Sequence, residues 1–314
     1  MRHTLLMGLA LLTTANCGLA ADSEPPEPAT SWKYPPEMPG SRVEVYRTVG
    51  DVELQAWVFE PVRKNLEPRP AIVFFFGGGW RGGTPGQFLP HCHYLSKRGM
   101  VAISVDYRVK TRNNTSPQDC LNDAKAAIRW VRENAKRLGV DPNRVVASGG
   151  SAGGHLAAAT GIVPGHDPNA DSPISSQPNA TVLFNPAVIL AKTDGEQLLT
   201  EEKLKDISER CLGRPEEISP FHHVRRKLPP SIIFHGTNDD AVPFPTVVAF
   251  RDRMVKLGNR CELVPFEGQP HGFFNAGRGK GEARAEANRR FHETTQLMDE
   301  FLVSLGYLRP LKKQ

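Results

Sequence analysis

The sequence contains no block of like charges and no stripe of interleaved aromatic and basic residues. It therefore lacks the usual electrostatic signature of a nucleic-acid-binding protein. The formal net charge is +5 and the charged fraction is 23%, which is ordinary for a globular chain. A modest positive excess says little about fold. Since the pattern of a nucleic-acid-binding protein is missing, we expect no nucleic-acid partner and look for function in local motifs.

Long apolar runs are also missing, so we expect no integral membrane span. The apolar run at 5–12 follows a basic start, is too short to cross a bilayer and precedes small residues. This pattern predicts a signal peptide over residues 1–21 and a secreted or periplasmic protein. The cleavage site, near Ala20 or Ala21, stays open, as does a retained N-terminal anchor. Asn16 before Cys17 disfavours a lipoprotein signal.

Cysteine is scarce, and its spacing fits no zinc motif. The run His91–His93 resembles a metal-binding sequence, but adjacent residues on a helix point in different directions, so we expect simple packing. Export permits disulfides, and four cysteines allow three full pairings between which the sequence cannot choose. We favour Cys92 with Cys120. The cysteines that remain after cleavage are Cys92, Cys120, Cys211 and Cys261.

Two nucleotide-binding motifs are absent as well. The glycine run Gly77–Gly79 is not followed by Gly-Lys-Ser/Thr, which argues against a phosphate-binding P-loop. No G-x-G-x-x-G with a downstream acid occurs, which disfavours a nicotinamide enzyme. We therefore expect a protein that needs no cofactor and no metal.

What the sequence does contain is a regular alternation of strands and helices. Residues 43–46 and 54–59 alternate apolar and polar side chains, as in an antiparallel hairpin. After Pro70, short apolar runs alternate with segments of helical periodicity, which predicts an α/β fold with a mostly parallel sheet and helices on both faces. We expect strands at 71–76, 101–105, 145–148, 181–184, 231–234 and 261–264, and helices at 87–98, 117–138, 152–162, 247–256 and 285–304.

The chain is long enough for one domain of this class. The proline-rich residues 22–40 read as a disordered linker. We place the domain at 41–308, with a small insertion at about 188–229 where the alternation breaks into polar sequence. One helical piece, 201–211, is expected inside this insertion.

The strongest chemical signal is Gly149-Gly150-Ser151-Ala152-Gly153. It joins a buried strand to a helix, and its glycines permit the sharp turn that exposes a nucleophilic serine. Serine needs a base. We choose His271, because it follows the last strand by a short loop and so lies at the carboxyl edge of the sheet. The pair His222 and His223 falls in the insertion and is not expected to be catalytic.

The base in turn needs a carboxylate. Asp239 and Asp240 both follow the strand at 231–234. Serine, acid and histidine then occur in the order typical of α/β-hydrolases, spaced by about 90 and about 30 residues.

Donors for an oxyanion are predicted at the glycine run. Backbone N–H groups of Gly78 and Gly79, with that of Ala152, are placed to form the hole. Trp80 and Phe273, with Phe88, are candidates to line a substrate subsite, although aromatic residues at strand ends more often belong to the core.

Together these motifs resemble the α/β-hydrolase superfamily over roughly residues 40 to 307, and in particular its secreted acetyl esterases and hormone-sensitive-lipase-like esterases, with acetylxylan and feruloyl esterase relatives. The family pattern His-Gly-x-x-Asp-x-x-Val-Pro matches His235 to Pro243, which selects Asp239 as the acid. The pattern Pro-His-Gly-Phe matches Pro270 to Phe273. Lipase-like members open the glycine motif with a loop-anchoring histidine. Phe76 stands there instead, which favours the acetyl esterases.

The resemblance implies a carboxylic ester hydrolase with a Ser-His-Asp triad and an acyl-enzyme intermediate. Short-chain acyl esters, either small molecules or acetylated polysaccharides, are the expected substrates. A serine peptidase of the same fold is the alternative, and a non-catalytic binding protein is a third possibility. The acyl chain, the alcohol and the oligomeric state cannot be read from the sequence.

Overall fold

A computed structural model of the chain describes residues 34–61, 67–195 and 197–311. The predicted signal peptide and the predicted linker up to residue 33 lie outside the described residues. The rest of that linker packs on the domain: Met38 is 5% exposed, and the Tyr34 hydroxyl donates to the Asp106 carboxylate.

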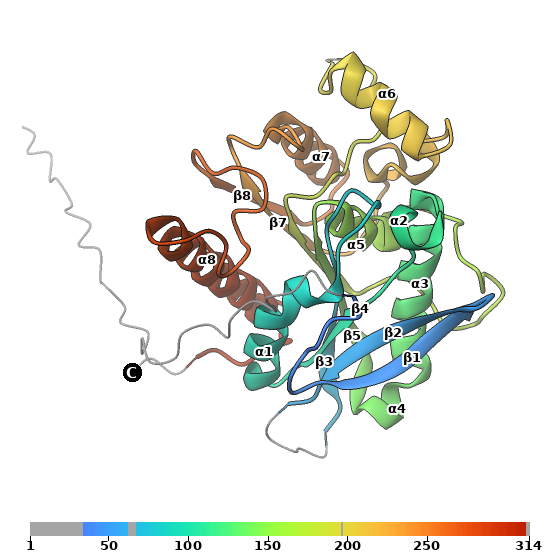
Figure 1. The fold of residues 1–314 in the computed structure, drawn as a ribbon, viewed down its shortest axis with the longest axis vertical. Helices are drawn as coiled ribbons and strands as arrows, with labels where there is room; N and C mark the ends of the chain where they lie inside the picture. The colour runs from blue at the N-terminus through green and yellow to red at the C-terminus, as the bar shows by residue number, and fades with distance from the viewer. Residues whose placement is uncertain (1–33, 62–66, 196, 312–314) are drawn as a thin grey trace, which may run out of the picture.

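The centre of the fold is an eight-stranded sheet with the order β1-β2-β4-β3-β5-β6-β7-β8 (Figure 1). β1 and β2 form the predicted antiparallel hairpin, and β2 runs antiparallel to β4. All other neighbouring pairs are parallel, which confirms the predicted fold class. The strands are β1 (Arg42–Val49), β2 (Val52–Phe59), β3 (Arg69–Phe75), β4 (Val101–Val105), β5 (Val140–Gly150), β6 (Ala180–Phe184), β7 (Ser231–Gly236) and β8 (Cys261–Phe266).

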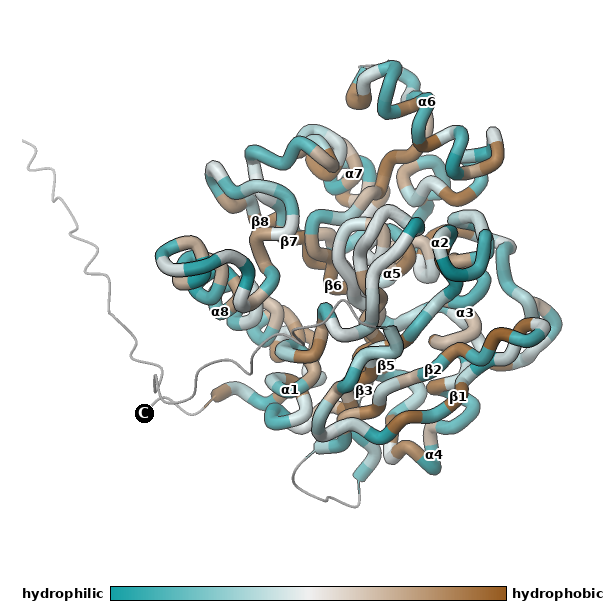
Figure 2. The backbone as a smooth tube through the Cα atoms, viewed as in Figure 1, coloured by the Kyte–Doolittle hydropathy of each residue, from teal (hydrophilic) through white to brown (hydrophobic). Residues whose placement is uncertain are grey.

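Helices cover both faces because the central strands are apolar on both sides. Along β3, Val73 and Phe75 belong to one core cluster and Ile72 and Phe74 to the other. Figure 2 shows this hydrophobic colouring along the inner strands. The first cluster packs under α3 (Pro117–Glu133), α5 (Ala152–Ile162) and α7 (Phe244–Lys256). The second packs under α1 (Leu89–Arg98), which follows the 3-10 turn η1 (Pro85–Phe88), and under α8 (Glu282–Ser304).

Two predicted elements differ in detail. The helix expected over 117–138 breaks at Asn134, whose side chain donates to the Trp130 carbonyl 2.9 Å away, and a short α4 (Ala135–Leu138) follows. The Asp-Pro-Asn sequence at 141–143, which is typical of a turn, lies instead within β5, where the register against β3 shifts between Arg69 and Ala71. Local hydrogen bonding decides both differences.

The insertion carries α6 (Glu201–Arg210) and the 3-10 turns η2 (Glu216–Ile218) and η3 (Pro220–His223). In Figure 1 it stands beyond the carboxyl ends of the parallel strands, where α6 forms the outermost element. Among the described residues, no helix combines the length and the apolar character needed to cross a membrane.

The favoured pairing of Cys92 with Cys120 is wrong, since both are free thiols. Cys92 lies in the core cluster under α1 and Cys120 in the one under α3, so the sheet separates them. Cys211 and Cys261 are also free and buried.

Candidate active site

Ser151 occupies a sharp turn between β5 and α5. Its φ is +56° and its ψ −119°, a strained conformation for a residue with a side chain. The flanking glycines make the turn possible. A Cβ on Gly153 would collide with the carbonyl oxygens of Phe75 and Phe76, and one on Gly149 would stand 2.6 Å from the Phe75 oxygen. The G-x-S-x-G spacing is thus required by close packing against the end of β3.

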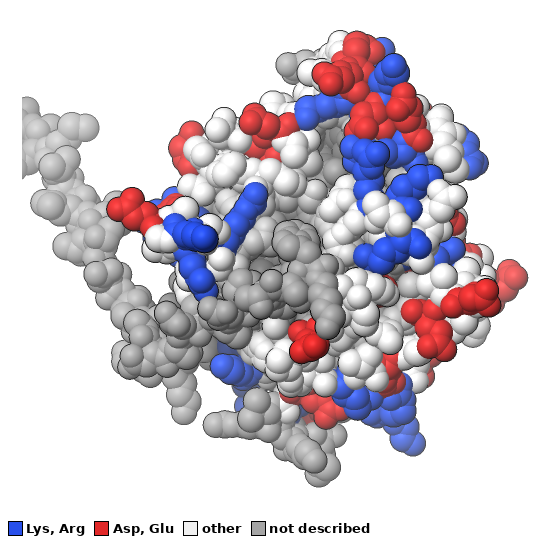
Figure 3. Space-filling view, in the orientation of Figure 1, with Lys and Arg blue, Asp and Glu red and all other residues white. Residues whose placement is uncertain are grey.

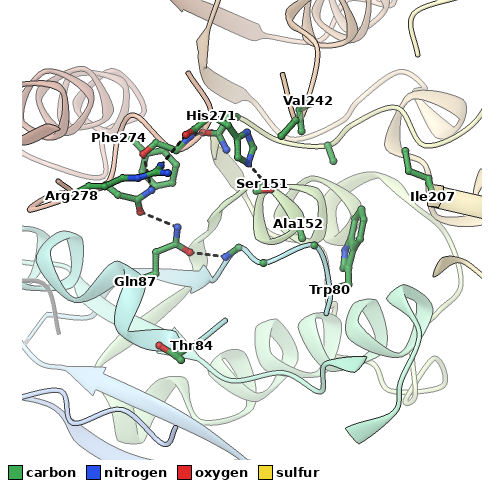
Figure 4. A pocket seen from close by; sticks show the side chains of 18 of the residues that line it. Trp80, Thr84, Gln87, Ser151, Ala152, Ile207, Val242, His271, Phe274 and Arg278 are labelled. Carbon is green, nitrogen blue, oxygen red and sulfur yellow. Dashed lines mark hydrogen bonds between the residues drawn. The ribbon is translucent and has the colours of Figure 1, made fainter. Parts of the chain in front are cut away.

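Parallel strands bring two distant side chains to this serine. His271, in the loop after β8, lies with Nε2 2.9 Å from Ser151 Oγ (Figure 4). Its Nδ1 lies 2.7 Å from Oδ2 of Asp239, which follows β7. The three residues that the sequence nominated for catalysis therefore form one continuous hydrogen-bonded chain.

Asp239 is held in a single orientation. Its Oδ1 accepts from the backbone N–H groups of Ala241 at 3.0 Å and Val242 at 2.8 Å. Its Oδ2 faces His271 and lies 3.3 Å from Nε2 of His235. Asp239 is 5% exposed, whereas its neighbour Asp240 is exposed. Of the two candidate acids, the structure thus brings only Asp239 to the histidine.

The glycine loop lies opposite the histidine, and two side chains brace its base. Tyr107 Oη donates to the Phe76 carbonyl at 2.7 Å, and the Gly77 N–H donates to Gln87 Oε1 at 2.6 Å. These contacts support the loop where the lipase-like pattern has a histidine. Gly78 has φ +129° and Gly79 φ +62°, so the turn after Gly77 requires glycine.

Trp80, which the sequence predicts to line a substrate subsite, does line the pocket, and a hydrogen bond to His155 holds its ring in place. Its Nε1 donates to His155 Nδ1 at 3.2 Å, and His155 Nε2 lies 2.8 Å from the Ile218 carbonyl. The tautomer follows, because Nε2 must carry the proton while Nδ1 accepts. Burial lowers the pKa of His155 to about 4, so the ring is neutral near neutral pH.

Phe273 and Phe88 are not in the pocket, which corrects the expectation for both. Phe273 packs on Phe266 with ring centroids 4.7 Å apart, and Phe88 stacks on Phe74 at 4.8 Å. Their side chains turn into the core under α1 and α8. The neighbouring Phe274 faces the pocket instead.

The pocket in front of Ser151 has a volume of about 820 Å³, within the range of small-molecule sites. The glycine loop forms one wall and the loop of His271 another. The insertion supplies a third wall, in which three apolar and three charged side chains take part: Ile189, Leu199, Ile207, Lys203, Asp206 and Arg210.

Two cations on α6 tie the insertion to the rest of the site. Lys203 Nζ donates to the carbonyls of Asp240 at 2.6 Å and Ala241 at 3.3 Å, in the loop of the acid. Arg210 Nη1 donates to the Gly79 carbonyl at 3.3 Å, in the glycine loop. Figure 3 shows Lys and Arg side chains gathered between α6 and α2 (Lys110–Asn113). The helix α6 is thus hydrogen-bonded to the loop of Asp239 through Lys203 and to the glycine loop through Arg210.

The sequence analysis did not predict three polar residues that line the site: Gln87, Asn185 and Asn275. Asn185 is fully buried and accepts from the Gly272 N–H at 3.0 Å, while its Nδ2 has no partner within the described residues. None of the three belongs to a motif. Only their position at the sheet edge reveals them.

No metal centre is formed within the described part of the chain, where no three His, Cys, Asp or Glu side chains are clustered. The metal-like run at 91–93 lies on α1. His91 is buried among aromatic rings, and both of its ring nitrogens lack a partner. Burial lowers its pKa to about 3. The packing role expected for this run fits that environment.

The BD-FAE family model matches residues 58–254, and the dienelactone hydrolase family model matches residues 216–302. The chain is also similar to solved structures of esterase 2 from Thermogutta terrifontis. One, phosphonylated by sarin, is 51% identical and has a TM-score of 0.83, covering 89% of this chain and 100% of that chain. Another, with bound butyrate, is 51% identical with a TM-score of 0.82 and covers 90% and 100%.

Curated relatives are more distant. Esterase LipC of Mycobacterium tuberculosis is 30% identical over 67% of this chain and 55% of its own length. An acetylxylan esterase of Xylanibacter ruminicola is 29% identical over 65% of this chain and 41% of its own length. The chain thus spans about half the length of the curated relatives that it matches.

Proposed function

The chain belongs to the BD-FAE family of α/β-hydrolase esterases, and from that premise we propose that it hydrolyses short-chain carboxylic esters with Ser151 as nucleophile, His271 as base and Asp239 as supporting acid. The single observation that carries the proposal is the unbroken chain from Ser151 Oγ to Asp239 Oδ2 through His271, with links of 2.9 Å and 2.7 Å.

In the first half of the reaction, Ser151 Oγ attacks the acyl carbon while His271 Nε2 accepts its proton. Asp239 holds the tautomer in which Nδ1 carries the proton and stabilises the imidazolium that forms. His271 then returns the proton to the leaving alcohol, which departs and leaves an acyl group on Ser151.

The negative charge that develops on the acyl oxygen needs donors already in place. We assign this role to the N–H groups of Gly78 and Gly79 and to that of Ala152. Ala152 is the first residue of α5, where backbone N–H groups have no intrahelical acceptor. Each such donor is typically worth about 3 kcal/mol in the transition state. In the second half, His271 activates a water that attacks the acyl carbon and releases the acid.

Short acyl chains are supported by the Thermogutta esterase, which binds butyrate. Acetylated carbohydrate is our preferred class of natural substrate, since one relative is an acetylxylan esterase and the N-terminal sequence is typical of exported proteins. Export to the periplasm or outside the cell is part of the same proposal. The relatives do not favour the peptidase alternative, because those compared are esterases.

The decisive experiment measures hydrolysis of p-nitrophenyl esters from acetate to octanoate by wild type and Ser151→Ala. We expect wild-type activity to peak at two to four carbons, and the variant to retain its melting temperature while losing turnover. A fluorophosphonate probe should label wild type and leave the variant unlabelled. Turnover by Ser151→Ala at the wild-type rate would refute the mechanism. Acetate release from acetylated xylan tests the substrate class.

A further inference from the structure

Two side-chain amides connect the glycine loop to the loop of His271. Gln87, in η1, accepts from the Gly77 N–H at 2.6 Å and donates through Nε2 to Asn275 Oδ1 at 2.9 Å. Asn275 Nδ2 then donates to the Gly272 carbonyl at 2.8 Å. Figure 4 shows the Gln87 side chain between the two loops, with a hydrogen bond to each.

The donors and acceptors in this series of hydrogen bonds fix the orientation of both side-chain amides. Gly77 N–H is a donor, so Gln87 must present its oxygen to it and its NH₂ to Asn275. Asn275 must then present its oxygen to Gln87 and its NH₂ to the Gly272 carbonyl. Rotating either amide by 180° would set two acceptors or two donors against each other. The two loops are therefore joined at a defined separation.

We call these hydrogen bonds from Gly77 through Gln87 and Asn275 to Gly272 the amide bridge. Both ends of the amide bridge lie next to groups assigned to the reaction. Gly77 directly precedes Gly78 and Gly79, the proposed oxyanion donors. Gly272 directly follows His271, and its own N–H is held by Asn185 Oδ1 at 3.0 Å. A change in the length of the bridge would move the donors relative to the base. Catalysis is sensitive to such shifts, since a misplacement of about 1 Å can cost about 100-fold in rate.

We propose that Gln87 is a positioning residue, which through Asn275 keeps the oxyanion donors of the glycine loop in register with His271. This inference rests on the proposed ester hydrolysis. Gln87 does not take part in bond making. Its effect is on the transition state, because the acyl oxygen carries full negative charge only there.

The test replaces Gln87 by the nearly isosteric Met, which removes both hydrogen bonds. We expect kcat for p-nitrophenyl acetate to fall by about 10- to 100-fold, less than the loss of a whole oxyanion donor, with KM within about 3-fold of wild type. The inhibition constant of phenylboronic acid, whose serine adduct is tetrahedral, should rise in parallel with the loss in kcat.

The matched control is Gln177→Met. Gln177 is half-buried like Gln87 and donates to one backbone carbonyl, that of Gly161, at 2.7 Å, but it does not line the pocket. We expect it to change the melting temperature at most, with kcat and boronate inhibition as in wild type. This control separates loss of an amide bond from loss of the bridge.

A second variant, Asn275→Leu, cuts the bridge at its other end while Gln87 keeps its bond to Gly77. Because both residues act through one chain, the double variant should lose little more than the larger single loss. Folding of each variant is checked by thermal melting. Q87M with kcat within about 2-fold of wild type, or losses that multiply in the double variant, would overturn the inference. A wild type that hydrolyses no ester and takes no fluorophosphonate would instead overturn the proposed function.

Discussion

Replacing Asp239 by Asn tests the assignment of the acid most severely, because the structure dictates which way the new amide faces. Two backbone N–H groups, those of Ala241 and Val242, converge on Oδ1. In the variant this position must remain an oxygen, since an NH₂ there would meet two donors. The amide nitrogen therefore takes the place of Oδ2, 2.7 Å from His271 Nδ1.

The consequence is a change of tautomer. An NH₂ facing His271 donates to Nδ1, so the neutral ring carries its proton on Nε2, the nitrogen 2.9 Å from Ser151 Oγ. The base then has no lone pair for the serine proton. We expect kcat to fall by about 10⁴-fold, equivalent to about 5 kcal/mol of transition-state stabilisation, with little change in KM.

The assay is p-nitrophenyl acetate hydrolysis at pH 7.5 on protein whose fold is verified by thermal melting. Asp240→Asn is the matched control: it removes the same charge one residue along, at an exposed side chain without contact to His271, and should leave kcat within about 2-fold. A loss below about 10-fold in Asp239→Asn, or an equal loss in both variants, would show that Asp239 does not orient the base.

Two further predictions concern stability. His91→Leu should raise the free energy of unfolding by about 1 kcal/mol and Tm by about 2 °C, because both ring nitrogens of His91 are buried without partners; urea and thermal melts showing a clear loss would contradict this. Burial lowers the pKa of His155 to about 4 from 6.5, so the unfolded chain binds the proton first as the pH falls. The stability from this residue is complete above about pH 6.5 and declines by about 3 kcal/mol on acidification to pH 4, and urea melts of His155→Gln should show a shallower decline.

Much of the fold could be predicted because the signals are local. Continuous apolar runs such as that of β3 report directly that both faces of a strand are buried. The alternation expected along 54–59 predicted the strand β2 but not its burial, since residues from Ala56 to Phe59 are buried on both faces of the sheet. The predicted bounds of α5 agree with the structure because Ser151 starts the helix after a turn that only glycine neighbours permit. The break at Asn134 was missed, since a side chain bonding to the turn before it leaves the helical spacing unchanged.

The site was predictable only in part. Ser151 and His271 belong to motifs, so their types and spacing were enough to nominate them. Choosing Asp239 over Asp240 needed a family pattern, and the burial of Asp239 supplies the physical reason. Assigning Phe273 to the pocket was wrong: both Phe273 and Phe274 belong to the same core cluster, and only Phe274 also borders the pocket, a difference that sequence alone does not reveal.

The amino-acid sequence by itself was enough for the strand and helix alternation and for the glycines that admit a strained serine, since each depends on residues close together in the chain. It was also enough for the order of the catalytic candidates, because Ser151 and His271 each stand in a short local motif. Tertiary structure alone decided the rest: that Cys92 and Cys120 lie on opposite faces of the sheet, that α6 spans the pocket, and that Gln87 meets Asn275 across 188 residues of sequence. Such contacts arise where parallel strands end at a common edge, and no local pattern records which loops meet there.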